Sequence, residues 1–268
     1  MRVHIFSLIT LVMVGVSASK LHASVLYGIT FNEQLITINT ITGAGTLVGN
    51  LSSDMNGFGL GTRNNKLYTF DQTVDLIREL NPATGATVDS FNIGVGNLQG
   101  EGAIDFRRSD GIGFLANDVL RRFDISNLSS TTIGSLNPGI DGLAFNSADV
   151  LYGVSEGGTQ LLTINQNTGA MTLVGNTGFT SSNFQLGGLD FDSNGELFAA
   201  FGTTSEPSLL YKLNPNTGAA TIIGNIGFNL VSGIAFLESS SLTVPEPASI
   251  VVFGLFAMGI AMIRIHKS

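Results

Sequence analysis

The chain repeats one pattern along most of its length, and this repetition limits the fold more than any other feature. Four copies and a fifth, divergent one begin at Leu26, Leu67, Leu151, Leu197 and Gly113, respectively. Most copies open with a segment such as Leu-Tyr-Gly, alternate apolar and polar residues, and turn at Asn-x-x-Thr-Gly before a last apolar segment. In the divergent copy, Leu128-Ser129-Ser130 replaces the Thr-Gly turn. Alternation with period two and a glycine turn predict three short β-strands per copy.

A fourth strand is expected before each copy, beginning at a glycine. These glycines are Gly57, Gly102, Gly142, Gly188 and Gly233. Their spacings of 45, 40, 46 and 45 residues are typical of a four-stranded β-propeller blade. The last such strand, at 231–236, has no copy after it, and the first copy has no such strand before it. We therefore expect residues 24–240 to form an all-β propeller, with five blades closed by pairing of the N- and C-terminal strands. An open β-solenoid or a sandwich of repeated hairpins is the alternative.

An aromatic residue occupies the same position near the start of every copy. This position holds Tyr27, Tyr68, Phe114, Tyr152 and Phe198. A position that accepts either ring type in every repeat is typical of packing between blades, whereas a sugar-stacking platform needs exposed aromatic faces. We expect these rings to lie in the core.

The N-terminal segment has the order of a secretory signal peptide. Arg2 precedes an apolar run at residues 5–16, and small residues follow it. The apolar run is shorter than the roughly 20 residues of a membrane-spanning helix. We expect residues 1–23 to be a signal peptide, with cleavage after Ala18 or Ala23.

The C-terminal segment has the order of a stop-transfer sequence. Pro245, Glu246 and Pro247 precede an apolar stretch at 248–263, expected to be a transmembrane helix, and basic residues end the chain. Residues 241–268 resemble the PEP-CTERM sorting tail of Gram-negative bacteria, although the basic tip of that family is richer in arginine. The resemblance implies recognition by an exosortase-type membrane enzyme, with transfer from the inner membrane to the cell surface or an extracellular polysaccharide matrix. A plain single-pass anchor is the alternative.

The repeats at residues 25–237 also resemble those of secreted propeller domains whose blades carry LYG and NTG-T-VG motifs. Most proteins with such domains are described as having unknown function, so this second resemblance implies an architecture and no activity.

The composition of the expected mature body excludes several classes of function. Residues 24–247 contain 20 acidic residues against 8 basic ones, a net charge of −12, which makes nucleic acid an unfavourable partner. The same residues contain no histidine and no cysteine. Nucleophilic sites of the Ser-His-Asp or Cys-His kind and zinc sites built on those ligands are therefore excluded.

One short motif predicts a calcium site. Asp190, Asp192 and Asn194, followed by Gly195, match the start of a calcium-binding loop, in which side-chain oxygens converge on the ion. Position 12 of such a loop is Phe201 here, where a bidentate glutamate is needed. The alternative is a hairpin turn, for which Asp, Asn and Gly are common residues.

The residues directly before the leading glycines form a second candidate site. They are Asn56, Glu101, Asp141, Gly187 and Ser232. In a propeller these positions ring one mouth of the central channel, where Glu101 and Asp141 are candidates to bind a cation or a polyol. Polar residues that merely line a water-filled channel are the alternative.

These observations predict an exported, non-catalytic interaction or structural module at the cell surface or in the matrix. Its expected partners are the sorting enzyme, extracellular polysaccharide and other envelope proteins, and no cofactor is expected apart from calcium. The alternatives are a calcium- or glycan-binding propeller and a polysaccharide hydrolase or lyase that uses Glu101 and Asp141, since two carboxylates suffice for glycoside cleavage.

Overall fold

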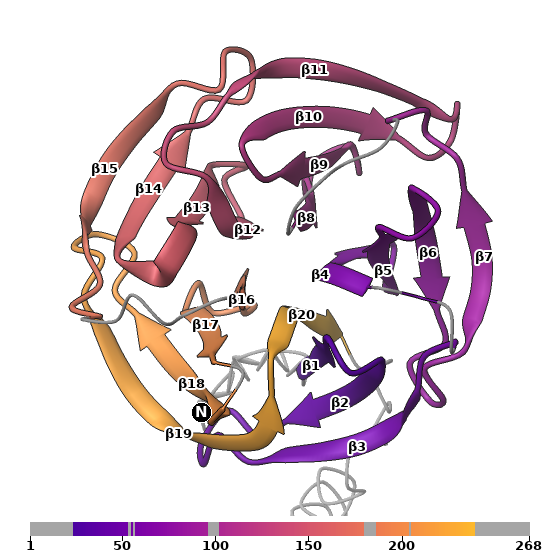
Figure 1. Ribbon diagram of the computed structural model, residues 1–268. Helices are drawn as coiled ribbons and strands as arrows, with labels where there is room; N and C mark the ends of the chain where they lie inside the picture. The colour runs from indigo at the N-terminus through magenta and orange to yellow at the C-terminus, as the bar shows by residue number, and fades with distance from the viewer. Residues whose placement is uncertain are drawn as a thin grey trace, which may run out of the picture. The chain divides into compact units, whose positions relative to one another are not determined.

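The computed structural model describes residues 24–52, 55, 57–95, 102–179, 186–203 and 205–238, which form a five-bladed β-propeller (Figure 1). Within these residues, twenty strands form five antiparallel sheets of four strands each. The predicted all-β fold with five four-stranded blades is therefore confirmed, and the solenoid and sandwich alternatives are wrong.

The four strands of each blade follow one another from the axis outward. Blade 1 consists of β20 (Val231–Glu238), β1 (Ser24–Thr30), β2 (Gln34–Ile38) and β3 (Gly45–Asn50). Blade 2 consists of β4 (Gly57–Arg63), β5 (Lys66–Asp71), β6 (Leu76–Leu80) and β7 (Thr87–Phe91). Blade 3 consists of β8 (Ala103–Phe106), β9 (Gly113–Ala116), β10 (Val119–Asp124) and β11 (Ser129–Ser135).

The last two blades follow the same plan. Blade 4 consists of β12 (Ile140–Phe145), β13 (Leu151–Ser155), β14 (Gln160–Ile164) and β15 (Met171–Asn176). A short 3-10 helix, η1 (Glu156–Gly158), lies between β13 and β14. Blade 5 consists of β16 (Leu186–Phe191), β17 (Leu197–Gly202), β18 (Pro207–Leu213) and β19 (Ala220–Asn229).

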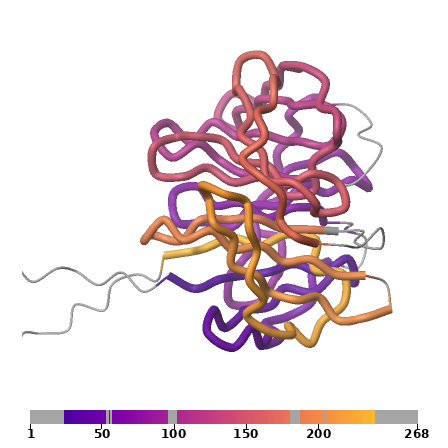
Figure 2. Tube along the Cα trace, turned by 90° about the vertical axis from the view of Figure 1, so that its left-hand side faces the viewer, coloured from indigo at the N-terminus to yellow at the C-terminus, as the bar shows by residue number. Residues whose placement is uncertain are grey.

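The two ends of the described chain meet in blade 1 and close the ring. Strand β20 pairs antiparallel with β1 from Ser24 opposite Glu238 to Thr30 opposite Val231. Figure 2 shows the two strands, indigo and yellow, running side by side. The predicted closure by residues 231–236 is thus confirmed, and it removes two sheet edges that would otherwise be open to pairing with another chain.

Aromatic rings join neighbouring blades at the predicted packing position. Tyr68, Phe114, Tyr152 and Phe198 each lie 5.1–5.3 Å, centroid to centroid, from a phenylalanine on the inner strand of the next blade, namely Phe106, Phe145, Phe191 and Phe236. The interplanar angles of 56–67° are tilted or edge-on, which is a favourable geometry for two aromatic rings. The second blade lacks such a phenylalanine, so Tyr27 packs instead in the apolar cluster around Leu60. The expectation of interblade packing is confirmed.

The Thr-Gly turns make a second contact between blades. Gly175 on β15 lies against the backbone of Thr217 in the turn of blade 5, where a Cβ atom would come within 1.9 Å of the Thr217 carbonyl oxygen. Gly49, Gly134 and Gly224 make the equivalent contact at three other junctions. The sequence pattern of the repeat therefore encodes how adjacent blades touch.

The junction between blades 2 and 3 is the exception to this contact. In the other blades, a glycine of the outer strand pairs with a leucine of the neighbouring strand. In blade 2, Phe91 on β7 takes the place of this glycine and pairs with Ile77. The turn it would meet belongs to the divergent repeat, where Leu128 takes the positive φ of 55°. The glycine and its partner turn are thus lost together.

The inner strands approach one another closely around the axis. A Cβ atom on Gly188 would lie 2.5 Å from the amide nitrogen of Ile234, and one on Gly233 would lie 2.4 Å from Gly59. The space enclosed by the described inner strands leaves about 0 Å³ for water. Where the described inner strands meet, backbone therefore packs against backbone, and this part of the axis has no room for water.

The propeller forms one compact unit, at Ala23–Ser239. The predicted signal peptide (1–23) and sorting tail (241–268), including Pro245, Glu246 and Pro247, lie outside the described residues. Among the residues that are described, we find no apolar helix of membrane-spanning length.

Candidate functional site

Of the predicted channel-mouth residues, Asp141, Gly187 and Ser232 are described, and each lies at the start of an inner strand. Asp141 is buried on β12, and its Oδ2 atom accepts a hydrogen bond from the Gly157 amide in η1, 3.0 Å away. Ser232 is buried on β20 and donates to the Gly57 carbonyl oxygen at 3.1 Å. Asn56 and Glu101 lie outside the described residues. The two described polar members of the set, Asp141 and Ser232, are therefore bonded to backbone groups, and the third described member, Gly187, has no side chain.

Strand pairing also corrects the register of this set. Ala144 in blade 4 and Asp105 in blade 3 are equivalent, because each pairs with the aromatic residue near the start of its repeat, Tyr152 or Phe114. Counting back two residues from each gives Gly142 in blade 4 and Ala103 in blade 3. The repeat equivalent of Asp141 in blade 3 is thus the residue before Ala103, which is Gly102 and not Glu101. In blade 2, a bulge between Phe58 and Gly61 shifts the register again.

The predicted calcium motif is divided between the core and a turn. Asp192 accepts hydrogen bonds from the amides of Asn194 and Glu196 in the β16–β17 hairpin, at 2.9 and 2.8 Å. Asn194 donates its side-chain amide to Asp192, and Gly195 takes a φ of 81°. Asp190 lies on β16 with 2% of its surface exposed. These contacts are those of a hairpin turn, and the described residues contain no cluster of three acidic or other metal-binding side chains.

Asp190 instead belongs to a network that joins blades 3, 5 and 1. Its Oδ2 atom accepts a hydrogen bond from the Phe236 amide on β20 at 2.6 Å. Its Oδ1 atom accepts one from Nη2 of Arg108, which follows β8, at 3.1 Å. Arg108 is 82 residues away in sequence, and its side chain is 35% exposed. The buried carboxylate of Asp190 in blade 5 thus bonds to blade 1 through a backbone amide and to blade 3 through the partly exposed Arg108.

Asp105 is the repeat equivalent of Asp190 in blade 3. It is buried on β8, and its Oδ2 atom accepts a hydrogen bond from the Phe145 amide on β12 of the next blade at 2.7 Å. The same position holds Ala144 in blade 4 and Ala235 in blade 1. Two of the five blades therefore replace a small apolar residue with a carboxyl group that bonds the next blade.

Burial changes how these two carboxyl groups titrate. It raises the pKa of Asp105 to about 8, with a further increase from the charge of Asp190 and an opposing effect of Arg108. Burial also raises the pKa of Asp190 to about 6, where Arg108 and the Phe236 amide oppose it. Near pH 7, Asp105 therefore holds its proton while Asp190 is ionised and pairs with Arg108. Because the two groups interact, the pair releases its protons in two steps.

A hollow lies over this network, at the C-terminal ends of the inner strands. It has two adjoining parts of about 380 and 300 Å³, which share Arg108, Phe236 and Glu238 as lining residues. We call both parts together the Arg108 hollow. Loops or strand ends of all five blades line it, contributing Arg63, Arg108, Ser147, Ser193 and Glu238.

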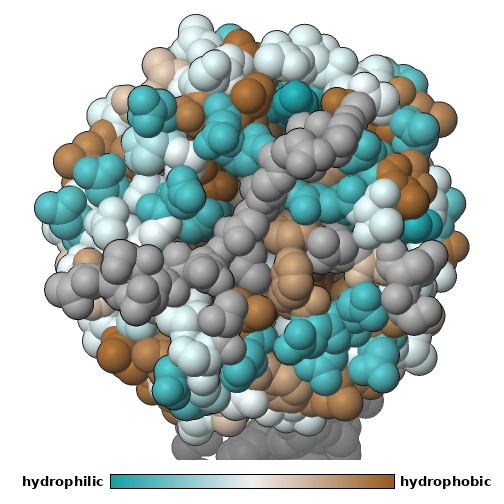
Figure 3. Space-filling model, viewed as in Figure 1, coloured by the Kyte–Doolittle hydropathy of each residue, from teal (hydrophilic) through white to brown (hydrophobic). Residues whose placement is uncertain are grey.

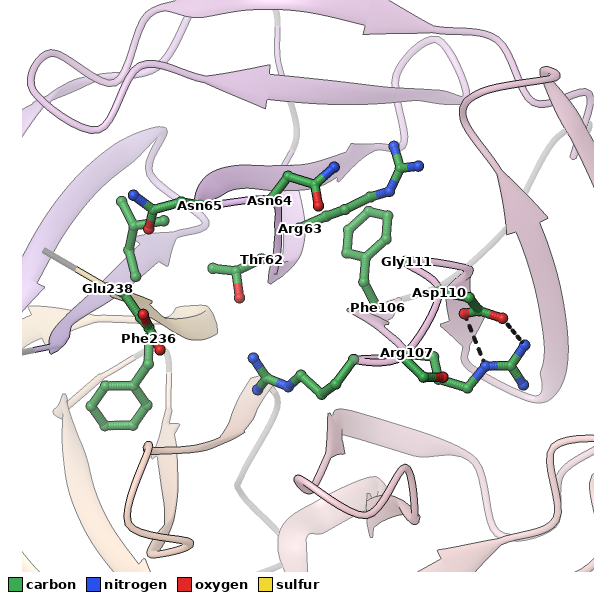
Figure 4. Close-up of a pocket in the computed structure, with 13 residues that line it drawn as sticks. Thr62, Arg63, Asn64, Asn65, Phe106, Arg107, Asp110, Gly111, Phe236 and Glu238 are labelled. Atoms are coloured by element: carbon green, nitrogen blue, oxygen red, sulfur yellow. Dashed lines mark hydrogen bonds and ion pairs between the residues drawn. The ribbon is translucent and has the colours of Figure 1, made fainter. Parts of the chain in front are cut away.

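The larger part of the Arg108 hollow carries paired charges on its wall. Figure 4 shows Phe236 and Glu238 on one side and Arg107 with Asp110 on the other. Arg107 and Asp110 form an ion pair, and Arg63 donates to the Ser126 hydroxyl at 2.9 Å. In Figure 3, hydrophobic side chains are scattered among hydrophilic ones on the face that it shows.

This geometry separates the residues that can touch a ligand from those that cannot. Asp105 and Asp190 are almost fully buried and bonded to backbone amides, so neither reaches a molecule in the hollow. Arg108 is anchored by Asp190 from below and lines both parts of the hollow. The site is thus built to hold an arginine in place rather than to present a pair of carboxyl groups.

Sequence reasoning missed Arg108 and the role of Asp105. The available signal was the position of Asp105 and Asp190, each inside an otherwise apolar strand directly before phenylalanine. A charged residue in a fully buried strand requires a partner. The sequence alone does not identify that partner as Arg108.

One comparison with solved structures agrees with the fold. No protein-family model matches this chain, and no curated protein sequence matches it. A chain from the crystal structure of a nidogen/laminin complex is similar, with a TM-score of 0.54 and 10% identity over 81% of this chain and 100% of that one. A structural genomics protein of unknown function from Bacteroides thetaiotaomicron has a TM-score of 0.47 and 14% identity, covering 75% of this chain and 50% of that one. The first likeness shows the propeller fold.

Proposed function

We propose that this chain is an exported envelope protein whose propeller is a non-catalytic interaction module, with the Arg108 hollow as its binding face. The observation that carries the proposal is that loops and strand ends from all five blades surround one hollow, in which the ion pair with Asp190 already holds the Arg108 side chain in place. A rigid ring that presents several loops around a concave surface is a common way for propellers to bind other molecules.

The buried carboxyl groups favour this role over that of a hydrolase or lyase. A general acid or base must come within hydrogen-bond reach of the substrate, about 2.6–3.2 Å. Asp105 and Asp190 have raised pKa values of the kind that catalysis uses, but each carboxyl group already accepts a hydrogen bond from a backbone amide of the next blade. Asp141 is likewise buried and bonded to Gly157.

The two ends of the sequence support the proposed destination of the protein. The segment 1–23 has the order of a signal peptide, and the tail at 241–268 resembles the PEP-CTERM sorting signal. In this proposal an exosortase-type enzyme recognises Pro245, Glu246 and Pro247 and passes the protein from the inner membrane to the surface or the matrix.

Replacing Pro245, Glu246 and Pro247 with alanines tests the destination, in a host that carries a matching sorting enzyme. We expect the variant to accumulate at the inner membrane with its tail intact. Alanines at Ser239, Ser240 and Ser241 provide a control of equal size that should be sorted like the parent. Equal display of the parent and the Pro-Glu-Pro variant would favour a plain anchor.

A binding screen tests the interaction role. The purified full chain is incubated with envelope extracts and extracellular polysaccharide, with and without calcium, and retained material and released sugars are both measured. We expect retention without release of sugar fragments. Cleavage of any polysaccharide by the parent would contradict the non-catalytic proposal, and retention that requires calcium would favour the calcium-binding alternative.

A further inference from the structure

Arg108 is held at both its backbone and its side chain before any ligand arrives. Its amide donates to Oδ1 of Asp149 in blade 4 at 2.9 Å, and its guanidinium donates to Asp190 in blade 5 at 3.1 Å. A guanidinium carries five N–H donors, and the side chain remains 35% exposed over the hollow. Because two blades fix its position, Arg108 loses little conformational entropy when an anion binds.

The surrounding charges select which anion fits. In the larger part, Arg63, Arg107 and Arg108 lie among Asp110, Glu238 and the buried Asp190, so the charges nearly balance. In the smaller part, Asp192 and Glu238 outnumber Arg108. The body as a whole has 20 acidic residues against 8 basic ones. Arg107 is already paired with Asp110 and Arg108 with Asp190, so the hollow has little positive charge left for a densely charged polyanion, and the net negative charge of the body disfavours one further. One carboxylate can instead share the Arg108 guanidinium with Asp190.

The remaining lining matches hydroxyl groups. Thr62, Asn64 and Asn65 line the larger part, and Ser147 and Ser193 line the smaller part. Side chains of these types donate and accept hydrogen bonds and suit a hydroxylated ligand. Each part, at about 380 and 300 Å³, falls in the lower range of small-molecule sites.

We propose that the Arg108 hollow binds a hydroxylated monocarboxylate, of the chemical class of a uronic acid residue in an otherwise neutral saccharide. The carboxylate pairs with Arg108, and the hydroxyl groups contact the threonine, asparagine and serine side chains of the wall. This inference rests on the proposed binding role of the hollow and names its ligand class.

The buried carboxyl groups add a pH signature to this site. Asp190, Asp105, Glu238 and Asp149 are the acidic groups whose charges act on Arg108. Asp105 has a pKa of about 8, so it is neutral near pH 7 and becomes negative above pH 8. The added negative charge next to Arg108 opposes a bound carboxylate, so affinity is expected to fall as the pH rises through about 8.

Titration calorimetry of the purified full chain tests the inference with D-glucuronate as the probe. D-glucose and the methyl ester of D-glucuronate, which lack the charge, serve as matched ligands. We expect glucuronate to bind at least about tenfold more tightly than either neutral sugar, because a charged hydrogen-bonded pair is lost with the carboxylate. Equal binding of the three sugars, or no binding of glucuronate, would overturn the inference.

Variants locate the binding to Arg108. Arg108→Gln combined with Asp190→Asn removes both charges, so no buried carboxylate is left unpaired. We expect this variant to keep its circular dichroism spectrum and to lose glucuronate binding by about tenfold or more. Arg122→Gln, an exposed change in the same blade, is the control and should bind as the parent does.

A second variant covers the case in which the double variant fails to fold. Arg108→Lys keeps the positive charge and loses the planar fork, and a several-fold loss of affinity is expected. Unchanged affinity in every folded Arg108 variant would refute the assignment. Failure of glucuronate binding together with normal sorting and retention of other partners would reject this ligand class and leave the proposed function standing.

Discussion

Asp105→Asn tests the buried carboxyl network through the pH dependence of stability. In the folded protein Asp105 has a pKa of about 8, compared with 3.8 for an ordinary aspartate. Between these values the folded state keeps a proton that the unfolded chain has released. The contribution of Asp105 to the free energy of unfolding is therefore largest below about pH 4 and falls as the pH rises toward 8.

The size of this effect follows from the same linkage. One bound proton changes the free energy of unfolding by about 1.4 kcal/mol per pH unit. Asp105 should thus lower the stability of the parent by on the order of 3 kcal/mol between about pH 5 and pH 7. Asparagine resembles the protonated carboxyl group and keeps an oxygen that can accept from the Phe145 amide. It does not titrate, so the variant loses this slope.

Urea unfolding of residues 24–238, followed by circular dichroism at the two pH values, measures the difference. Asp190, with a pKa of about 6, titrates in both proteins. Between pH 5 and pH 7, Asp105 keeps its proton and asparagine is also neutral, so the pH dependence that Asp190 adds is nearly the same in the two proteins. Asp118→Asn, at an exposed position in the same blade, should leave the slope of the parent unchanged. The reasoning fails if Asp105→Asn and the parent lose the same stability between the two pH values.

Three further perturbations test the packing of the ring. Gly175→Ala places a Cβ atom within 1.9 Å of the next blade's turn, and we expect a loss of about 3 kcal/mol in urea unfolding, while Gly102→Ala, with nothing nearer than 3.9 Å, should be nearly neutral. Phe145→Ala removes a fully buried ring and should cost about 3–5 kcal/mol, against less than about 0.5 for Ile41→Ala at an exposed position. Deleting residues 231–238 removes the strand that closes the ring, and gel filtration should then show unfolded or oligomeric protein; a stable monomer would contradict the closure.

The fold was predictable because each repeat carries its whole blade in sequence. Strand alternation, the turn glycine and the unmatched strand at 231–236 follow from local pattern, and the ring follows from counting them. The register of the inner strands was harder to predict from the sequence. A bulge in β4 and the short β8 shift the repeat by one or two residues, and leading glycines alone do not reveal such shifts.

The candidate site was not predictable for a physical reason. Arg108 and Asp190 are 82 residues apart and lie in blades that are not adjacent along the chain. Their contact depends on how the ring closes and which strand ends meet over the axis. Both aspartates are visible in the sequence, but Asp190 matches a calcium motif, and Asp105 lies in a predicted strand without any motif around it.

The closure of blade 1 also sets an order of events for a newly made chain. Strand β1 is among the first described segments to leave the ribosome, and its partner β20 is the last, with about 200 residues between them. Contacts between such distant segments form late, because the intervening chain must first be organised. Until β20 arrives, β1 exposes an edge that is open to pairing with another unfinished chain. A chain made from its N-terminus therefore needs its last strand before its first blade is complete.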